Sequence, residues 1–460
     1  MPVVKHRVGI AFLCALNAGC ALTAAKPAAP ELPPAFQNQP ASQAPWPGKS
    51  WYDGFGSAEL SSLLAQAAGR NLDLTMARAR LAQADARARQ AGAAILPSVD
   101  AGGNANFLAG HSVNGSAHET DWSALVSASY EVDFWGKNRA TAHAAEFLAA
   151  ASRADRDTLA LTTSAGVAST YFQILSLRER LLTAQANVDA ARGLLDVIKA
   201  RFEAGMSTPV ELAAQKAVLA NASLAIPALQ QQEGEALAAL ALLVGRAPEG
   251  FTVQARSLEA LSLPVVAAGL PSDLLTRRPD IFMAEANMQA AHADLVAARA
   301  ALYPSLSLTA SGGVQNPAVQ AAVITLSGVG PSLNIGAALV QTIFDGGRLR
   351  AIRAEAQAKD EELVTAYRAA ILSALVDVEN ALGALRHLDE AREFQVESVA
   401  QSERAFEGAR LRYKEGSGDY LAVLDAQRTL YTARDQFSQY KLARLQALVT
   451  LCKALGGGWT

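Results

Sequence analysis

Alternating side chains in one stretch, Trp122–Phe134, constrain the fold of this chain more than any other feature of its sequence. The even positions of the stretch are all apolar, and the odd positions are polar except for Leu125. Because successive side chains of a strand point to opposite faces, we predict a β-strand with one apolar and one polar face. The stretch exceeds the roughly 9–11 residues that a tilted strand needs to cross a bilayer, and an aromatic residue stands at each end of its apolar face.

Three further stretches share this alternation and are predicted strands: Ser98–Gly110, Ser305–Val314 and Leu333–Ile343. We expect a loop at His111–Asp121 between the first two strands. Four strands cannot close a barrel, and an open sheet edge is not tolerated in lipid. Either the strands form a sheet in a soluble protein, or several copies of the chain pool their strands in a membrane.

The amino terminus, residues 1–19, has the pattern of an export signal. A basic start, Lys5-His6-Arg7, precedes an apolar run that is too short to span a membrane. The ending Ala18-Gly19-Cys20 resembles a bacterial lipobox, which implies that Cys20 carries a covalent lipid such as palmitate and becomes the mature amino terminus. Asn17 stands where an aliphatic residue is usual, so a plain secretory peptide cleaved nearby is the alternative.

Residues 20–60 are predicted to form a lipid-anchored N-terminal tether. The segment Ala21–Gly48 is rich in proline, alanine and glutamine, a composition typical of extended linkers. Ala21 stands beside the predicted anchor where an aspartate would be a retention signal. By family-level sorting rules, this indicates delivery to the outer membrane.

Composition and motifs exclude several functional classes. The chain has 460 residues, of which 51% are hydrophobic and 18% charged, and its formal net charge of −3 gives no reason to expect nucleic acid as a partner. Its cysteines, Cys14, Cys20 and Cys452, provide no disulfide framework. The sequence has no phosphate-binding loop, nucleophile elbow or metal-spaced set of cysteines and histidines. We therefore expect no enzyme, no metal site and no cofactor besides the lipid on Cys20.

Two long proline-free stretches, Asn138–Ala204 and about Arg348–Lys414, predict helices of unusual length. At ~1.5 Å per residue each would be ~100 Å long, which indicates a coiled coil. A tight turn follows each, at Gly205–Pro209 and at Gly416–Tyr420, and leads into a returning helix. A bundle of membrane-spanning helices is the competing topology. We reject it because no apolar run of roughly 18 or more residues has the composition and flanks of a span.

The order of these elements occurs twice, which predicts an internal repeat. Asp73-Leu74-Thr75-Met76-Ala77 returns as Asp280-Ile281-Phe282-Met283-Ala284, and Arg201-Phe202 returns as Arg412-Tyr413. The predicted domains are repeat 1 at residues 61–246, a linker at 247–272, and repeat 2 with a C-terminal tail at 273–460. Each repeat is expected to contain a helix, a β-hairpin, a long helix and a returning helix, so the predicted fold is α+β with long α-helices predominant.

Several motifs in this order resemble those of the TolC-like outer-membrane channels. The motifs are Arg278-Pro279-Asp280-Ile281, Ser129–Gly136, Ala301–Leu306 and the run from Gly416 to Gln427. They are most similar to the OprM/NodT-type lipoproteins of resistance–nodulation–division multidrug efflux systems, and the resemblance spans the chain after the tether. It implies a homotrimer in which four strands per chain form a 12-stranded transmembrane β-barrel, continued by a periplasmic α-helical coiled-coil barrel.

The resemblance also implies a function. It implies a passive conduit of a tripartite pump that carries drugs or other small molecules to the exterior and so supports antibiotic resistance. The implied partners are a periplasmic adaptor protein and an inner-membrane resistance–nodulation–division transporter, and the implied location is the outer membrane of a Gram-negative bacterium. Two alternatives remain open: a duct for type I protein secretion, and a non-conducting structural coiled-coil lipoprotein of the envelope.

The resemblance places a periplasmic gate at Arg412, Tyr413, Leu421 and Asp425. Leu421 and Asp425 lie one helical turn apart, so three copies would form a leucine ring and an aspartate ring around one opening. Converging carboxylates repel one another, so closure is expected to respond to pH. In the alternative interpretation, Leu421 packs between helices and Asp425 is merely solvated.

The two helical tips are the expected contacts with the adaptor. The residues concerned are Gly205 and Pro209 in the first repeat and Gly416 and Tyr420 in the second. A glycine turn leaves the backbone free to pack against another helical hairpin. The alternative is that these glycines only make the turns.

Overall fold

The computed structural model describes residues 32–38, 46–48, 50–112, 115–264, 266, 269, 271–316, 319–321, 324–326 and 330–457. The predicted signal segment and Cys20 lie outside the described residues. The chain divides into two compact units, which are described separately. Among the described residues, the strand unit is drawn from Ala84–Ala149 and Ala286–Ala366, and the helical unit from Glu31–Gln83, Ala150–Glu285 and Tyr367–Thr460.

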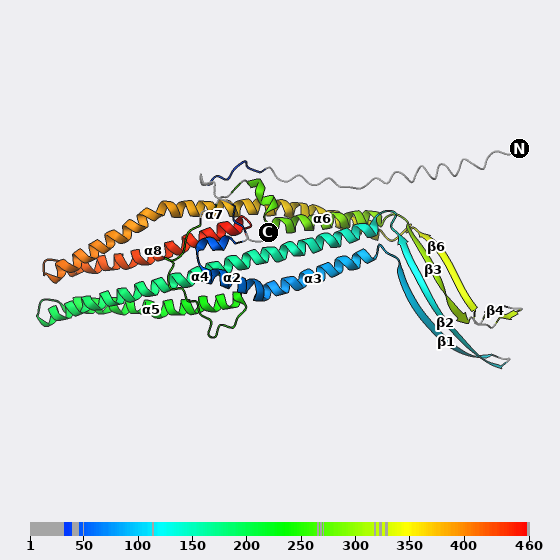
Figure 1. Cartoon of the computed structure of the whole chain (residues 1–460), viewed down its shortest axis with the longest axis horizontal. Coiled ribbons are helices and arrows are strands. Elements are labelled where there is room, and N and C mark those ends of the chain that lie inside the picture. The colour runs from blue at the N-terminus through cyan, green and yellow to red at the C-terminus, as the bar shows by residue number, and fades with distance from the viewer. Residues whose placement is uncertain are drawn as a thin grey trace. The chain divides into compact units, whose positions relative to one another are not determined.

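The same order of main elements occurs twice along the chain (Figure 1). The first half comprises α3 (Leu72–Ala93), β1 (Ser98–Ser112), β2 (Gly115–Val132), α4 (Lys137–Glu203) and α5 (Pro209–Val244). The second half comprises α6 (Pro279–Ala300), β3 (Ser305–Asn316), β6 (Gly330–Val340), α7 (Arg348–Lys414) and α8 (Tyr420–Ala454). The predicted long helices agree with α4 and α7 to within about one residue at each end.

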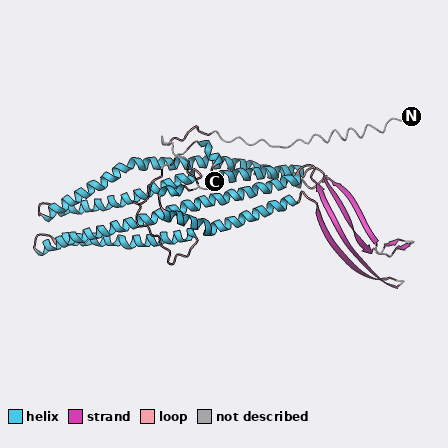
Figure 2. Cartoon of the chain, viewed as in Figure 1, coloured by secondary structure: helices cyan, strands magenta, loops and turns pink. Residues whose placement is uncertain are grey.

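Several short elements accompany this pattern. Three short helices, η2 (Trp51–Phe55), α2 (Ala58–Arg70) and η3 (Pro271–Thr276), precede the main elements of each half. Two strands that the sequence analysis did not predict, β4 (Val319–Ala321) and β5 (Ile324–Leu326), pair with each other. Helix nevertheless dominates the chain, as expected (Figure 2).

β1 and β2 are longer than predicted, and the expected loop at His111–Asp121 is wrong. Antiparallel pairing continues without a break from Ser98 opposite Ser129 to Ser112 opposite Gly115. Most of the predicted loop is therefore paired strand. Hydrogen bonding between the two backbones continues there, although its polar side chains lack the apolar–polar alternation of a predicted strand. β6 also lies about three residues earlier in the sequence than the predicted Leu333–Ile343.

The four long strands form one antiparallel sheet in the order β1-β2-β3-β6. Its register places apolar residues opposite apolar residues: Val126 faces Ala101, and Leu308 faces both Tyr130 and Ala337. Because side chains alternate along each strand, the apolar sets of all four strands share one face. The exposed large side chains of this apolar sheet face include Val99, Phe107, Val126, Leu308, Ile335 and Leu339. In the described part of the chain, β1 and β6 are the edges of this sheet.

A carboxylate marks each transition from a strand to a long helix. Asp133 accepts hydrogen bonds from the backbone amides of Asn138 (3.0 Å) and Arg139 (2.8 Å) at the start of α4. Asp345 does the same for the amide of Leu349 (2.9 Å) at the start of α7. The first amides of a helix have no partner within the helix, so these side chains help to fix where α4 and α7 begin.

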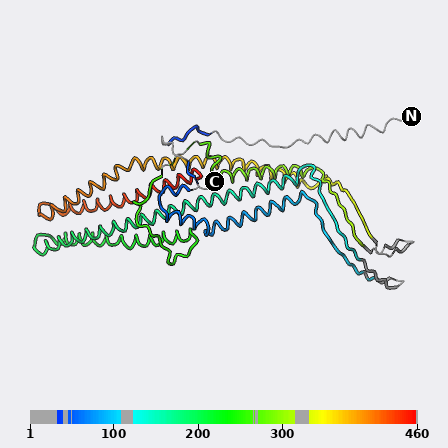
Figure 3. Tube along the Cα trace, viewed as in Figure 1, coloured from blue at the N-terminus to red at the C-terminus, as the bar shows by residue number. Residues whose placement is uncertain are grey.

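The core of the helical unit joins helices from both halves of the sequence. It contains Phe55 from η2, Tyr171 and Phe172 from α4, Leu240 from α5 and Cys452 from α8. The ring of Phe55 lies 4.9 Å from that of Phe172. The chain also forms two helical hairpins, α4 with α5 and α7 with α8, whose backbones reverse in short turns at the left of Figure 3.

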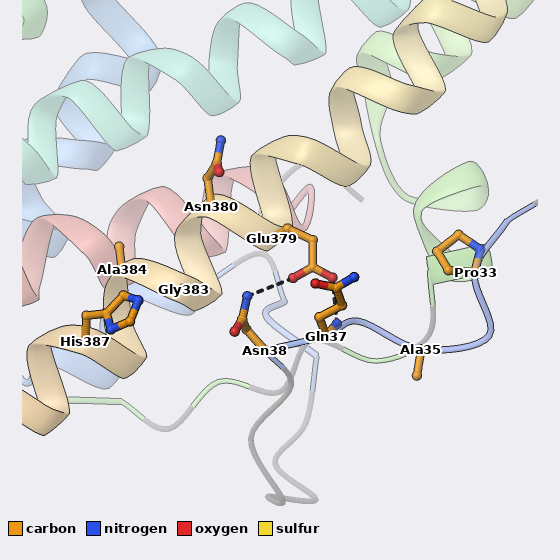
Figure 4. Close-up of a pocket in the computed structure, with 9 residues that line it drawn as sticks. All are labelled: Pro33, Ala35, Gln37, Asn38, Glu379, Asn380, Gly383, Ala384 and His387. Carbon is orange, nitrogen blue, oxygen red and sulfur yellow. Dashed lines mark hydrogen bonds between the residues drawn. The ribbon is translucent and has the colours of Figure 1, made fainter.

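A short segment in the middle of the predicted tether, residues 36–38, contacts α7. Phe36 is buried, and the backbone amide of Gln37 donates to Glu379 (2.7 Å). Asn38 Nδ2 donates to the other carboxylate oxygen of Glu379 (3.1 Å), and a pocket lined by His387 opens beside this contact (Figure 4). This part of the predicted tether therefore belongs to the helical unit and is held against α7.

Each half of the chain closes with the same contact. Gly245, which follows α5, has a φ of 74°, and a Cβ atom there would stand 2.3 Å from the carbonyl oxygen of Arg70. Gly456, which follows α8, has a φ of 73°, and a Cβ atom there would stand 2.4 Å from the carbonyl oxygen of Arg277. Both the positive φ and the close approach require glycine.

The residue after each of these arginines binds the end of the returning helix. Asn71 Nδ2 donates to the carbonyl of Leu243 (2.8 Å), and Arg278 Nη1 donates to the carbonyl of Ala454 (3.0 Å). Asn71 and Arg278 occupy equivalent positions in the predicted repeat. The contacts that close the two halves are therefore alike in backbone and differ in side chain.

α5 bears on one expectation. By length and composition this helix could cross a membrane, and 11% of its apolar window is buried. The expectation was that no apolar run has both the composition and the flanks of a span; α5 meets the requirement of composition, and its flanks stay untested. The exposed large side chains of α5 are Val210, Leu224 and Leu242.

Candidate functional site

Both helical hairpins turn through the same backbone motif. After α4, the amides of Gly205 and Met206 donate to the carbonyls of Phe202 (3.0 Å) and Arg201 (2.7 Å). After α7, the amides of Gly416 and Ser417 donate in the same way to Tyr413 (3.1 Å) and Arg412 (2.9 Å). Both glycines have positive φ, of 71° and 76°, as this type of helix ending requires. The predicted turns are thus explained by helix-capping chemistry.

The predicted docking residues differ in exposure. Gly205, Pro209 and Gly416 are exposed, and Pro209 occupies the first position of α5 as expected. Tyr420 is 4% exposed, so its side chain offers little surface at the second tip, and its part in docking stays a prediction. The sequence analysis missed Met206, whose apolar side chain is 62% exposed at the first tip.

A polar cluster at Glu211 joins the two hairpins. Glu211 accepts hydrogen bonds from the hydroxyl of Ser207 in its own turn and from the hydroxyl of Tyr413 on α7 (3.3 Å). Arg201 Nη1 donates to the backbone carbonyl of Tyr413 (2.7 Å), and its guanidinium lies 4.6 Å above the tyrosine ring. Two residues of the first repeat, Arg201 and Glu211, therefore contact Tyr413. We call Arg201, Glu211 and Tyr413 the tip clasp.

A second contact joins the hairpins beside the tip clasp. The hydroxyl of Tyr420 and Gln215 Oε1 lie 3.0 Å apart, and Gln215 Nε2 donates to the carbonyl of Ala191 on α4 (3.0 Å). Both side chains are buried. Burial, with the electrostatic influence of Tyr413 and Glu211, raises the pKa of Tyr420 to about 12, so its hydroxyl keeps the proton that it donates.

Charge is stabilised within the tip clasp. The hydrogen bond from Ser207, followed by those from the backbone of Thr208 and from Tyr413, holds the pKa of Glu211 below its ordinary value. Burial raises the pKa of Tyr413, so this side chain stays neutral and donates. At neutral pH the clasp therefore contains a carboxylate, a guanidinium and a phenol in complementary states.

The predicted gate residues do not all come together within one chain. Tyr413 is buried in the tip clasp, whereas Arg412 is exposed. Leu421 is 66% exposed, and Asp425 pairs with Arg428 (3.3 Å) with both side chains in solvent. The alternative in which Leu421 packs between helices of its own chain is therefore not observed, whereas Asp425 is solvated here as that alternative states. Leu421 and Asp425 lie on an open part of α8.

Of the residues at this site, Tyr413 was predicted from the sequence, whereas Arg201, Glu211 and Gln215 were not. Their partners lie about two hundred positions away in the sequence, so local spacing carries no sign of the contacts. The paired motifs Arg201-Phe202 and Arg412-Tyr413 marked the two turns as equivalent, but they did not indicate that Arg201 contacts Tyr413. Within the described ranges, no group of three histidine, cysteine or acidic residues is arranged to hold a metal ion.

Comparisons with known proteins agree with this architecture. A family model described as outer membrane efflux protein matches residues 63–246 and 270–457, one match to each half of the chain. The pyoverdine export outer membrane protein OpmQ of Pseudomonas aeruginosa is 43% identical, covering 89% of this chain and 88% of that protein. The cation efflux system protein CusC of Escherichia coli is 30% identical, again covering 89% and 88%. The solved structure of the outer-membrane channel OprN superposes with a TM-score of 0.85 at 26% identity, covering 95% of this chain and 99% of that one.

Proposed function

This chain belongs to the outer membrane efflux protein family, and we propose that it is the outer-membrane channel of a tripartite efflux pump. Proteins of this family are channels located in the outer membrane of Gram-negative bacteria and use no cofactor. The proposed role is a passive conduit for small molecules, with the driving force supplied by other components.

The observation that carries the proposal is the sheet. It has one exposed apolar face and two unpaired edges, at β1 and β6. In lipid such edges must be paired, and three copies of four strands would close a 12-stranded barrel. We therefore propose a homotrimer with the apolar sheet face toward lipid and the helices in the periplasm.

The proposed partners are a periplasmic adaptor and an inner-membrane resistance–nodulation–division transporter. Gly205, Pro209 and Gly416 stay in the proposed docking surface, and Met206 joins them. A bulky side chain at either glycine would strain a positive φ, so those changes test the turn as much as the docking. Met206→Glu leaves the turn intact. It should reduce cross-linking to the adaptor and efflux while trimer yield stays normal, and normal efflux in that variant would contradict the docking surface.

A gate at Leu421 and Asp425, with Arg412 and the tip clasp beside it, is proposed to close the periplasmic end. Three copies of the open face of α8 around one axis would form an apolar and an acidic ring. The tip clasp would hold this face in place, because it fastens α7 to the first repeat next to the turn into α8.

Single-channel recording of purified trimers in planar bilayers tests the conduit and the gate together. Leu421→Ser with Asp425→Ala should raise conductance and weaken cation preference. The matched control is Leu182→Ser, which removes an equally exposed leucine (67% against 66%) from α4. A complete absence of conductance would favour the structural lipoprotein. Unchanged conductance in the double variant would place the gate elsewhere.

The exported substrate and the lipid anchor remain proposals with their own tests. The relative at 43% identity is named for pyoverdine export, so pyoverdine is the first substrate to test, by comparing its release from a deletion strain with that from the parent strain. Export of a protein substrate instead would support type I secretion.

Cys20→Ser should abolish acyl labelling, and labelling that survives would contradict the anchor.

A further inference from the structure

Arg278 is a buried charge that the proposed conduit leaves unexplained. Its side chain is 9% exposed, and its guanidinium binds groups from three helices. Two nitrogens donate to Asp280 at the start of α6 (3.0 and 2.5 Å), Nη2 also donates to Asp377 on α7 (2.9 Å), and Nη1 donates to the carbonyl of Ala454 on α8 (3.0 Å). One side chain thus ties α6, α7 and α8 together.

The charge of this group is firmly maintained. Burial by itself would lower the pKa of Arg278, but the hydrogen bonds and charges of Asp280 and Asp377 outweigh burial, and the pKa is raised. Charge-assisted hydrogen bonds in such surroundings are strong. If one partner were removed, the buried guanidinium would lack part of the compensation for its lost hydration. The three helices are therefore held in one geometry at this point.

The equivalent position of the first repeat lacks an ionic link. Asn71 donates to the carbonyl of Leu243 on α5 and accepts from the amide of Leu74 on α3 (2.9 Å). Asn71 carries no charge, and these two contacts serve the helices before and after the long one. The ionic link to the long helix is thus a feature of the second repeat, whose hairpin also carries Leu421 and Asp425.

The α7–α8 hairpin is fastened at two separated points. One is the tip clasp at Tyr413, and the other is Arg278 at Asp377, roughly 54 Å away along α7 at 1.5 Å per residue. We propose that Arg278 is a positioning residue for the gate. Arg278 fixes the α7–α8 hairpin to α6 through Asp377 and Ala454. Opening therefore bends this hairpin between Asp377 and the tip and does not displace it as a whole. This inference rests on the proposed gate.

The test uses the first repeat as a template. Arg278→Asn gives the second repeat the side chain that the first has at Asn71, and should raise the open probability of purified trimers in planar bilayers on the order of tenfold. The matched control is Arg444→Gln, which removes another ion pair between α8 and α7, to Asp389 (2.7 Å), without involving α6. Arg444→Gln channels should stay closed like wild type.

Stability is measured beside conductance, because a merely structural residue would lower the melting temperature of the trimer without opening it. If Arg278→Asn yields no trimers, Asp377→Asn replaces it, since Arg278 then keeps Asp280 and Ala454. Intact trimers of either variant that stay closed would overturn the proposal, and so would opening by Arg444→Gln to the same extent. The variant with Leu421→Ser and Asp425→Ala is recorded in parallel. If this double variant behaves like wild type while Arg278→Asn channels open, the proposed position of the gate is wrong, but the positioning role of Arg278 is still supported.

Discussion

Gly245 and Gly456 hold positions that no other residue can occupy without strain. Each has a positive φ and each lies against a backbone carbonyl, that of Arg70 or Arg277. Neither requirement can be relaxed by rotating a side chain, since both involve the backbone. At both positions, therefore, the contact that closes each half of the chain depends on the backbone and not on a side chain.

Substitution of either glycine should therefore destabilise the helical unit. Gly245→Ala is expected to lower the free energy of unfolding by at least about 1 kcal/mol from the positive φ alone, with the clash added. Gly234, inside α5, has open space around its Cα, so Gly234→Ala should be neutral or stabilise by about 0.5–1 kcal/mol. Thermal unfolding of the purified trimer followed by circular dichroism distinguishes the two, and equal melting temperatures would contradict the argument.

The tip clasp should respond to acid through Glu211. Its pKa is lower in the folded protein than its ordinary value of 4.5, so its contribution to stability is present above that value and is lost as pH falls through the folded pKa. Channels should therefore keep the clasp above pH 4.5 and open more often as the pH falls below that value. Glu211→Gln should remove this acid step in recordings made across that range, whereas Glu203→Gln, at an exposed position on α4, should retain it. An acid step of the same size in Glu211→Gln would exclude Glu211 as its cause.

At the residue scale, the sequence predicted types of position better than partners. The turn glycines and Pro209 were identified because capping rules are local. The burial of Tyr420 was not predicted, because it involves Gln215, which lies on the other hairpin. Contacts between distant segments depend on how helices pack, and one sequence without an alignment contains no direct record of that packing.

Among the elements, helices were predicted more accurately than strands. α7 has its predicted ends because glycines precede and follow a long run of good helix formers. β1 and β2 were cut short because polar side chains interrupt the alternation, although hydrogen bonding between the backbones continues to Ser112 and Gly115. A helix makes its hydrogen bonds with itself, whereas a strand ends only where its neighbour ends, so strand ends are properties of the pair.

The two faces of the sheet should differ sharply in their tolerance of charge. Ile335 is 80% exposed on the apolar sheet face, and the adjacent Asn334 is exposed on the opposite face. Ile335→Arg should cost about 2–4 kcal/mol if this face meets lipid, and Asn334→Arg should be tolerated. The yield of heat-stable trimers from outer-membrane extracts measures the difference. Equal yields would contradict the proposed orientation of the sheet.

At the scale of the whole molecule, the unpaired edges of the sheet and the exposed apolar side chains of α5 both call for further copies of the chain. Among the described residues, no strand pairs with the outer edges of β1 and β6, and lipid supplies no hydrogen-bond partners. Native mass spectrometry of detergent-extracted protein should give three times the mass of the mature chain. A folded, conducting monomer would contradict the pooled barrel.

The continuity of α4 and α7 restricts how such a chain can change in length. Both helices pass from the strand unit into the helical unit without a loop. One inserted residue would turn every later side chain by about 100° around the helix axis, moving its buried stripe into solvent, whereas seven residues restore the orientation to within about 20°. Natural length differences inside these helices should therefore occur in steps of about seven residues, while loops accept any number. The lengths of α4 and α7 should therefore change in increments of two helical turns, because only such insertions keep the buried side chains on the same face.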